Sequence, residues 1–178
     1  AIRVIRPDGE LVLERSGNDL PGKIIHHDGV MLPGGHILAL VNELQTHDID
    51  GQATELKGDG LAVWDSDGEV LWEWSAFDHL DVERLPGLLS SQPRPQGGSS
   101  LDWTHGNGLD FDEENSQILI SLRHQNWVIA VNYPAGDVAW TLGEDGDFEL
   151  TEGDWFYSQH MPVLLDDGDA LAAEIRDL

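Results

Sequence analysis

Apolar and polar residues alternate along much of the chain, in short runs separated by glycine-containing turns. The clearest run extends from Ala62 to Trp74, where two apolar stretches flank an Asp-Gly pair. This pattern predicts an antiparallel β-hairpin, because glycine accepts the positive φ that such a turn requires. The same hairpin recurs at 4–13 and 129–142. The three turn glycines, about 60 residues apart, are Gly9, Gly68 and Gly136.

A second repeated unit begins with a histidine and continues as an apolar hairpin. It starts at His27 and again at His160, with Leu38 and Leu171 at matching positions further along. A third copy starts at His105 and has a longer turn at 112–116. Two hairpins in each period form a four-stranded unit, and repeated units of this kind are typical of β-propellers.

We therefore expect an all-β chain that covers about three blades of a β-propeller built from four-stranded blades. Three blades do not close a ring, so further blades or a second chain would complete it. The stretch at 88–100 is rich in proline, glycine and serine, which predicts a loop that is either a cover over the channel or a plain surface insertion. The expected divisions are a half blade 1–24, a blade 25–75, an insertion 76–103, a blade 104–143 and a half blade 150–178.

Charge and cysteine content narrow the function classes. The formal net charge is -25, from 34 acidic against 9 basic residues, so no nucleic-acid partner is expected, because phosphate binding needs a basic face. The acidity fits either a surface adapted to high salt or an acidic patch for cations. Without any cysteine, disulfides, thiolate catalysis and cysteine zinc sites are excluded.

The histidine repeat predicts a functional site. If His27, His105 and His160 share one position in three blades, a propeller brings them to one rim of its channel, close to Arg123. Converging imidazoles bind metals, with Asp28 and Asp102 as additional ligands, but the fixed charge of Arg123 repels a divalent cation. An anion site fits better, because a guanidinium grips sulfuryl or phosphoryl oxygens. We therefore expect no metal and no cofactor.

Five segments together resemble the bacterial and archaeal arylsulfate sulfotransferases. The spacing from His105 to Arg123 is similar to that of the family. The resemblance covers most of the chain from about residue 24, and it implies a six-bladed, exported or membrane-anchored propeller. The matching segments are 26–38, 102–107, 120–130, 140–143 and 158–162.

The resemblance also implies a reaction: a sulfuryl group passes from an aryl sulfate to a phenol through a sulfohistidine, without a nucleotide sulfate donor. His160 would be the nucleophile, Arg123 would hold the sulfuryl oxygens, and His27 and His105 would position the sulfate and move protons. His26 replaces His27 if the strand register slips by one residue. The residues expected to bind substrate are Asn107 and His124, with Trp103, Trp127, Trp155 and Tyr157 as aromatic candidates for the aryl ring.

Two other functions remain open at this stage. A non-catalytic extracellular propeller would use the same fold as a binding or interaction module. A metal-dependent lyase or hydrolase would use the same histidines with a bound cation. The expected partners of the leading hypothesis are an aryl sulfate and a phenol, with a homo-oligomer or further blades completing the ring.

Overall fold

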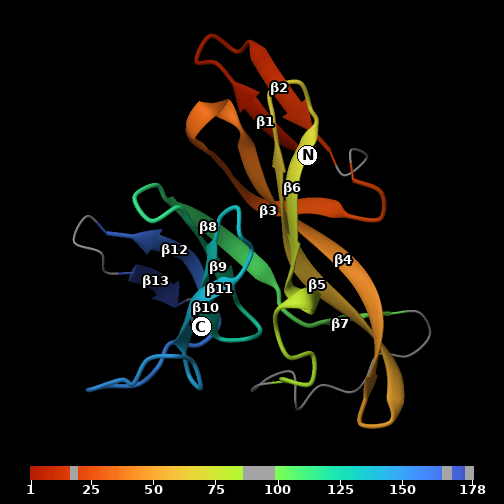
Figure 1. Cartoon of the computed structure of the whole chain (residues 1–178), viewed down its shortest axis with the longest axis vertical. Helices are drawn as coiled ribbons and strands as arrows, with labels where there is room; N and C mark the ends of the chain where they lie inside the picture. The colour runs from red at the N-terminus through yellow and green to blue at the C-terminus, as the bar shows by residue number, and fades with distance from the viewer. Residues whose placement is uncertain (17–19, 86–98, 166–169, 175–178) are drawn as a thin grey trace.

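The structure is a computed structural model that describes residues 1–16, 20–85, 99–165 and 170–174. The described residues form β-strands in four sheets and contain no α-helix (Figure 1). This confirms the all-β class expected from the alternating pattern. The four sheets are separate and none of them closes on itself within the described ranges, so the expected ring is not seen here. Two short 3-10 helices, η2 (Pro33–Gly35) and η3 (Ala76–Asp78), interrupt the strands.

The N-terminal half contains a hairpin followed by a larger sheet. In the larger sheet, strands β3 to β6 pair antiparallel in chain order, and the short strand β7 pairs parallel with β5. Residues 86–98, which hold most of the stretch expected to be a loop, lie outside the described ranges. The strands are β1 (Ile2–Ile5), β2 (Leu11–Arg15), β3 (Ile24–Met31), β4 (Ile37–Ile49), β5 (Gln52–Trp64), β6 (Val70–Ser75) and β7 (Leu101–Asp102).

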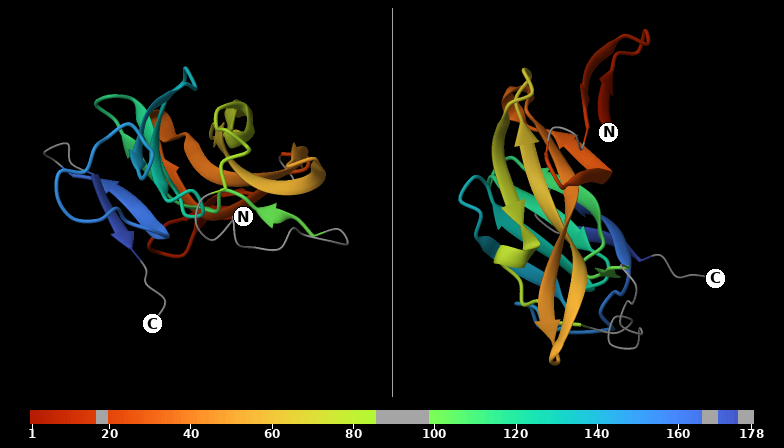
Figure 2. Two further views of the ribbon diagram at one scale, coloured as in Figure 1. Left: turned by 90° about the horizontal axis from the view of Figure 1, so that it is seen from below. Right: turned by 90° about the vertical axis from the view of Figure 1, so that its right-hand side faces the viewer.

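The C-terminal half contains a four-stranded sheet and a second hairpin. Strands β8 to β11 pair antiparallel in chain order, and β12 pairs with β13. The hairpin lies beside the four-stranded sheet in both figures of the whole chain (Figures 1 and 2). The strands are β8 (Gly106–Asp112), β9 (Gln117–Leu122), β10 (Trp127–Asn132), β11 (Val138–Gly143), β12 (Gln159–Leu164) and β13 (Ala170–Glu174).

The paired segments 37–41 of β4 and 58–64 of β5 are buried on both faces, which explains their continuous apolar runs. Leu38 and Leu40 belong to a core shared with β9 and β10, whereas Ala39 and Val41 belong to a second core that Ile2 of β1 covers. Successive side chains of a strand point to opposite faces, so the sheet β3–β6 lies between two cores. Each fully buried leucine contributes about 1.5–3 kcal/mol.

The first strands of three sheets lie side by side. Strand β8 contacts β3 on one side and β12 on the other. Each contact includes a carboxylate that accepts a backbone N–H from the next sheet: Leu109 donates to Asp28 at 2.9 Å, and Leu164 donates to Asp110 at 2.8 Å. These links fix the spacing of the three strands that begin with the repeated histidines.

Candidate active site

His27 and His160 lie where a first strand interrupts its regular pairing, and His105 directly precedes a first strand whose pairing shifts within its first three residues. His27 and His105 have positive φ angles of 48° and 51°, and beside His160 it is Met161 that has a φ of 49°. Positive φ is uncommon for residues other than glycine, and a bulge redirects the side chain next to it. The pairing shifts fall between Ile25 and Gly29, between Gly106 and Gly108, and between His160 and Val163.

Three imidazoles from two sheets are in contact. The rings of His27 and His105 are 5.4 Å apart between centroids, and those of His105 and His124 are 4.5 Å apart. Arg123 precedes His124 in the turn after β9, and its Nη1 lies 3.3 Å from His124 Nε2. The structure therefore brings together four of the residues expected to form the site.

The turn that carries Arg123 is tied to the segment before β8. The backbone N–H of Arg123 donates to the His105 carbonyl at 3.1 Å, and that of His124 donates to the Thr104 carbonyl at 3.0 Å. These two hydrogen bonds hold the turn with Arg123 and His124 next to the segment that carries His105.

Asp102 orients two of the imidazoles. Its Oδ2 lies 2.6 Å from His105 Nδ1, its Oδ1 lies 3.2 Å from Lys57 Nζ, and its backbone carbonyl lies 2.6 Å from His124 Nδ1. Carboxylate and carbonyl oxygens only accept, so both Nδ1 atoms carry protons. In neutral His105 the lone pair is therefore on Nε2, on the side of the ring away from Asp102.

His160 is held by its neighbour Gln159 and by a close approach of β12 to β8. The Gln159 carbonyl accepts hydrogen bonds from Asn107 Nδ2 at 2.9 Å and from Ser121 Oγ at 3.2 Å. A Cβ added at Gly108 would lie 2.7 Å from Met161 Cα, so only glycine fits there. Asn107, expected to bind substrate, thus holds the backbone beside His160, and its binding role remains a prediction.

The surroundings of three imidazoles lower their pKa values, which favours the neutral form. Burial lowers the pKa of His160, and the neighbouring Arg123 and His105 lower it further. Burial likewise lowers the pKa values of His27 and His124. The Nδ1 atom of His160 is buried without a hydrogen-bond partner among the described residues. A neutral imidazole retains a lone pair, which both a nucleophile and a base require.

The aromatic candidates lie in different surroundings. Trp103 is fully buried, stacks on Phe77 at 5.1 Å and donates from Nε1 to the Arg84 carbonyl. It is therefore a core residue in this structure, not a surface for an aryl ring. The ring of Trp127 lies 3.6 Å from the guanidinium carbon of Arg84.

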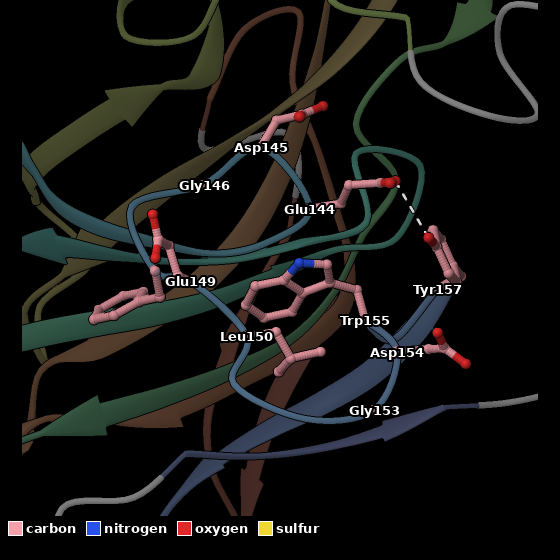
Figure 3. A pocket seen from close by; sticks show the side chains of 10 residues that line it. Glu144, Asp145, Gly146, Glu149, Leu150, Gly153, Asp154, Trp155 and Tyr157 are labelled. Atoms are coloured by element: carbon pink, nitrogen blue, oxygen red, sulfur yellow. Dashed lines mark hydrogen bonds between the residues drawn. The ribbon is translucent and has the colours of Figure 1, made fainter.

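Tyr157 and Trp155 line an acidic pocket whose lining includes none of the histidines. The Tyr157 hydroxyl donates to Glu144 at 3.3 Å across the mouth of this pocket (Figure 3). Tyr157 is 41% exposed. Its expected contact with the aryl ring remains a prediction, and its observed contacts are with the loop after β11.

Metal ligands are present but already engaged. Asp102, His105 and His124 each offer an atom within 4.8 Å of the others. However, Asp102 already pairs with the Nδ1 atoms of both rings, and Lys57 and Arg123 place two positive charges beside the trio. This donor set fits a hydrogen-bonded cluster better than a site for a divalent cation.

Sequence reasoning missed Asp59, which is 3% exposed on β5. Its Oδ1 lies 2.9 Å from His26 Nε2, and His26 Nδ1 lies 2.7 Å from His27 Nδ1. The available signal was an acidic residue between Gly58 and Gly60, directly before the apolar run that ends β5. A carboxylate there needs a buried partner.

The fold and site together define an all-β protein whose histidines and arginine meet where neighbouring sheets adjoin. The sequence model of the arylsulfotransferase (ASST) family matches residues 11–176 of this chain. Because this match covers nearly the whole chain, the protein belongs to the arylsulfotransferase family.

One solved structure supports the fold. It is the crystal structure, at 1.35 Å resolution, of a protein of unknown function from Bacteroides caccae, similar to this chain with a TM-score of 0.51 and 15% identity. The match covers 96% of this chain and 44% of that protein, so the chain spans less than half of its length. Comparison with curated proteins finds no match. Among the described residues, no helix is long and apolar enough to cross a membrane.

Proposed function

We propose that the protein transfers a sulfuryl group from an aryl sulfate to a phenol through a sulfohistidine, without a nucleotide sulfate donor. The observation that carries the proposal is the contact of His105 with both His27 and His124, together with the contact of His124 with Arg123. Family membership supplies the reaction class. Lowered pKa values for three imidazoles favour nucleophilic and base chemistry over simple anion storage.

In the first step, the Nε2 lone pair of His160 attacks sulfur while the bond from sulfur to the aryl oxygen breaks. The proton of neutral His160 stays on Nδ1. The departing phenolate takes the bonding electrons and accepts a proton from a protonated Nε2 of His105, whose Nδ1 is held by Asp102. Arg123 faces the sulfuryl oxygens, where a preorganised cation stabilises the charge of the transition state.

In the second step, the oxygen of the accepting phenol attacks sulfur and the bond between sulfur and His160 breaks. The electron pair of that bond returns to the imidazole. The phenolic proton passes to a neutral Nε2 of His27 or His105. A proton taken by His27 then has to move on to His105, which restores the starting state. The two half-reactions predict double-displacement kinetics.

The first test is covalent labelling. Incubation with 4-nitrophenyl sulfate should add one sulfuryl group to His160, detected by peptide mass spectrometry, and His160→Ala should abolish both labelling and transfer. His36→Gln, a histidine next to η2, is the matched control and should label normally. Transfer that persists in His160→Ala would move the nucleophile to another residue.

Two other outcomes would replace the proposal. A protein that binds aryl sulfates without turnover, and in which Arg123→Gln changes only stability, would be a non-catalytic binding module. Activity that a chelator removes and a divalent cation restores would indicate the metal-dependent hydrolase.

We also propose that the four sheets are consecutive parts of one propeller. Support comes from the side-by-side first strands β3, β8 and β12 and from the two aspartate links between them. A second copy or further blades would complete the ring, and we propose an exported location by analogy with the family. A crystal structure in which these strands do not face a common axis would refute the arrangement.

A further inference from the structure

A second histidine lies behind His27 and links it to a buried carboxylate. The His26 side chain is 17% exposed and that of Asp59 is 4% exposed, and His26 Nε2 lies 2.9 Å from Asp59 Oδ1. No hydrogen bond of regular geometry joins these two atoms, so the contact is mainly electrostatic. On the other side of the ring, His26 Nδ1 is hydrogen-bonded to His27 Nδ1 at 2.7 Å.

The partners of Asp59 decide where the protons are. Its Oδ2 accepts hydrogen bonds from the Thr104 hydroxyl and the Gly106 N–H, which leaves Oδ1 facing His26. A lone pair on His26 Nε2 would be repelled by a carboxylate oxygen at this distance, so Nε2 carries the proton.

The proton on His26 Nε2 then determines the tautomer of His27. In neutral His26 the lone pair is on Nδ1, which must accept from His27 Nδ1, because one partner of a hydrogen bond has to donate. His27 consequently holds its proton on Nδ1 and its lone pair on Nε2.

We propose that Asp59 and His26 are positioning residues that fix this tautomer, so that His27 Nε2 is the proton acceptor for the incoming phenol. The inference rests on the proposed sulfuryl transfer and assigns the base of its second step. As the phenolic oxygen bonds to sulfur, its proton moves to His27 Nε2 and the electrons of the breaking N–S bond return to His160. The positive charge that forms on His27 faces Asp59 through His26.

The charges around His27 agree with this assignment. Burial and the neighbouring imidazoles His26, His105 and His160 all lower the pKa of His27, whereas Asp59 raises it. Among the described groups that act on this ring, Asp59 is therefore the one that favours the protonated base. Without it, none of these groups would offset the lowering of the His27 pKa by burial and by the neighbouring imidazoles.

Asp59→Asn tests the proposal because the amide should reverse which ring nitrogen carries the proton, first in His26 and then in His27. Thr104 and Gly106 still donate, so the amide oxygen takes the place of Oδ2 and the NH₂ group faces His26 Nε2. His26 Nε2 must now accept, which moves its proton to Nδ1 and turns His27 into the Nε2–H tautomer. Long-range ¹H–¹⁵N NMR of ¹⁵N-histidine-labelled protein reports both tautomers directly, with or without substrate.

We expect wild-type protein to show His27 as Nδ1–H and Asp59→Asn to show it as Nε2–H. Asp112→Asn, which changes a buried aspartate at the end of β8, should leave the tautomers unchanged. An Nε2–H tautomer of His27 in the wild type, or no change in Asp59→Asn, would overturn the inference.

Kinetics separate this role from a structural one. With 4-nitrophenyl sulfate, whose leaving group needs little protonation, labelling of His160 should proceed in Asp59→Asn at a rate close to that of the wild type. Transfer from labelled His160 to phenol should fall about 10–100-fold, as for other residues that orient a functional histidine. An equal loss in both half-reactions would indicate structural damage and refute the positioning role. Absence of labelling in the wild type would instead remove the proposed function.

Discussion

Gly108→Ala should move His160 without touching any histidine. The added Cβ would lie 2.7 Å from Met161 Cα, 2.8 Å from Met161 N and 2.9 Å from Pro162 Cδ. Ordinary contacts begin near 3.4 Å, so β12 has to retreat by about 0.7 Å. The atoms in the way are backbone and a proline ring, so no flexible side chain can absorb the shift. His160, next to Met161, moves with them.

The displacement of His160 should slow the labelling reaction. A misplacement of about 1 Å costs an enzyme roughly 100-fold, so labelling of His160 by 4-nitrophenyl sulfate should slow by about 10–100-fold. Overpacking should also lower the free energy of unfolding by about 1–3 kcal/mol, or roughly 2–12 °C in melting temperature for a domain of this size. Rapid-quench labelling measures the first effect, and thermal denaturation followed by circular dichroism measures the second.

Gly146→Ala is the matched control. Gly146 lies in the loop after β11, which carries no histidine. A Cβ added to it would lie 2.5 Å from the Thr141 carbonyl oxygen. It should destabilise the protein by a similar amount and leave the labelling rate unchanged. Wild-type labelling in Gly108→Ala, measured below the melting temperature of both variants, would refute the claim that the approach of β12 to β8 sets the position of His160.

Three further predictions concern charge and packing. Arg123→Gln should raise the pKa of His160, because a positive charge that lowers it is removed; since only neutral His160 reacts, the acidic limb of the labelling rate should move to higher pH. Burial raises the pKa of Asp102, but its contacts with His105 and Lys57 outweigh this and lower it overall. Asp102 therefore stabilises the fold above its unfolded pKa of about 3.9, an effect lost as pH falls through the lower folded value. Urea unfolding of Asp102→Asn across pH 3–6 should show a weaker pH dependence. Trp103→Ala should cost about 3–5 kcal/mol of unfolding free energy, whereas Tyr157→Phe should cost under about 0.5 kcal/mol, both measured by urea denaturation.

The alternating pattern was sufficient for the fold class but not for the site. Hairpins are local, so glycine-containing turns and apolar runs identified the strands around Gly68 and Gly136. The contact of His27 with His105 was predicted only because the repeats place them in equivalent positions. The closure of a ring depends on how sheets are arranged relative to one another, which no local pattern specifies.

The partners behind the histidines were not predictable in the same way. Asp59 reaches His26 because β3 and β5 belong to one sheet with β4 between them, and nothing in the sequence indicates that cross-sheet distance. Trp103 was misjudged for a related reason: it follows Asp102 directly, yet its ring points into the core shared with Phe77. Adjacency in the sequence does not determine which side of the backbone a ring occupies.

The kinked backbone beside His27, His105 and His160 has a consequence for redesign. Strand pairing and the aspartate links set the kinks. Among the described residues, none of these three imidazoles forms a hydrogen bond to the backbone of another strand. We therefore expect that one of these imidazoles can be replaced by a carboxylate or an amide without loss of the fold. Such a replacement would change which ligands the cluster can bind, while the strands that present it stay in place.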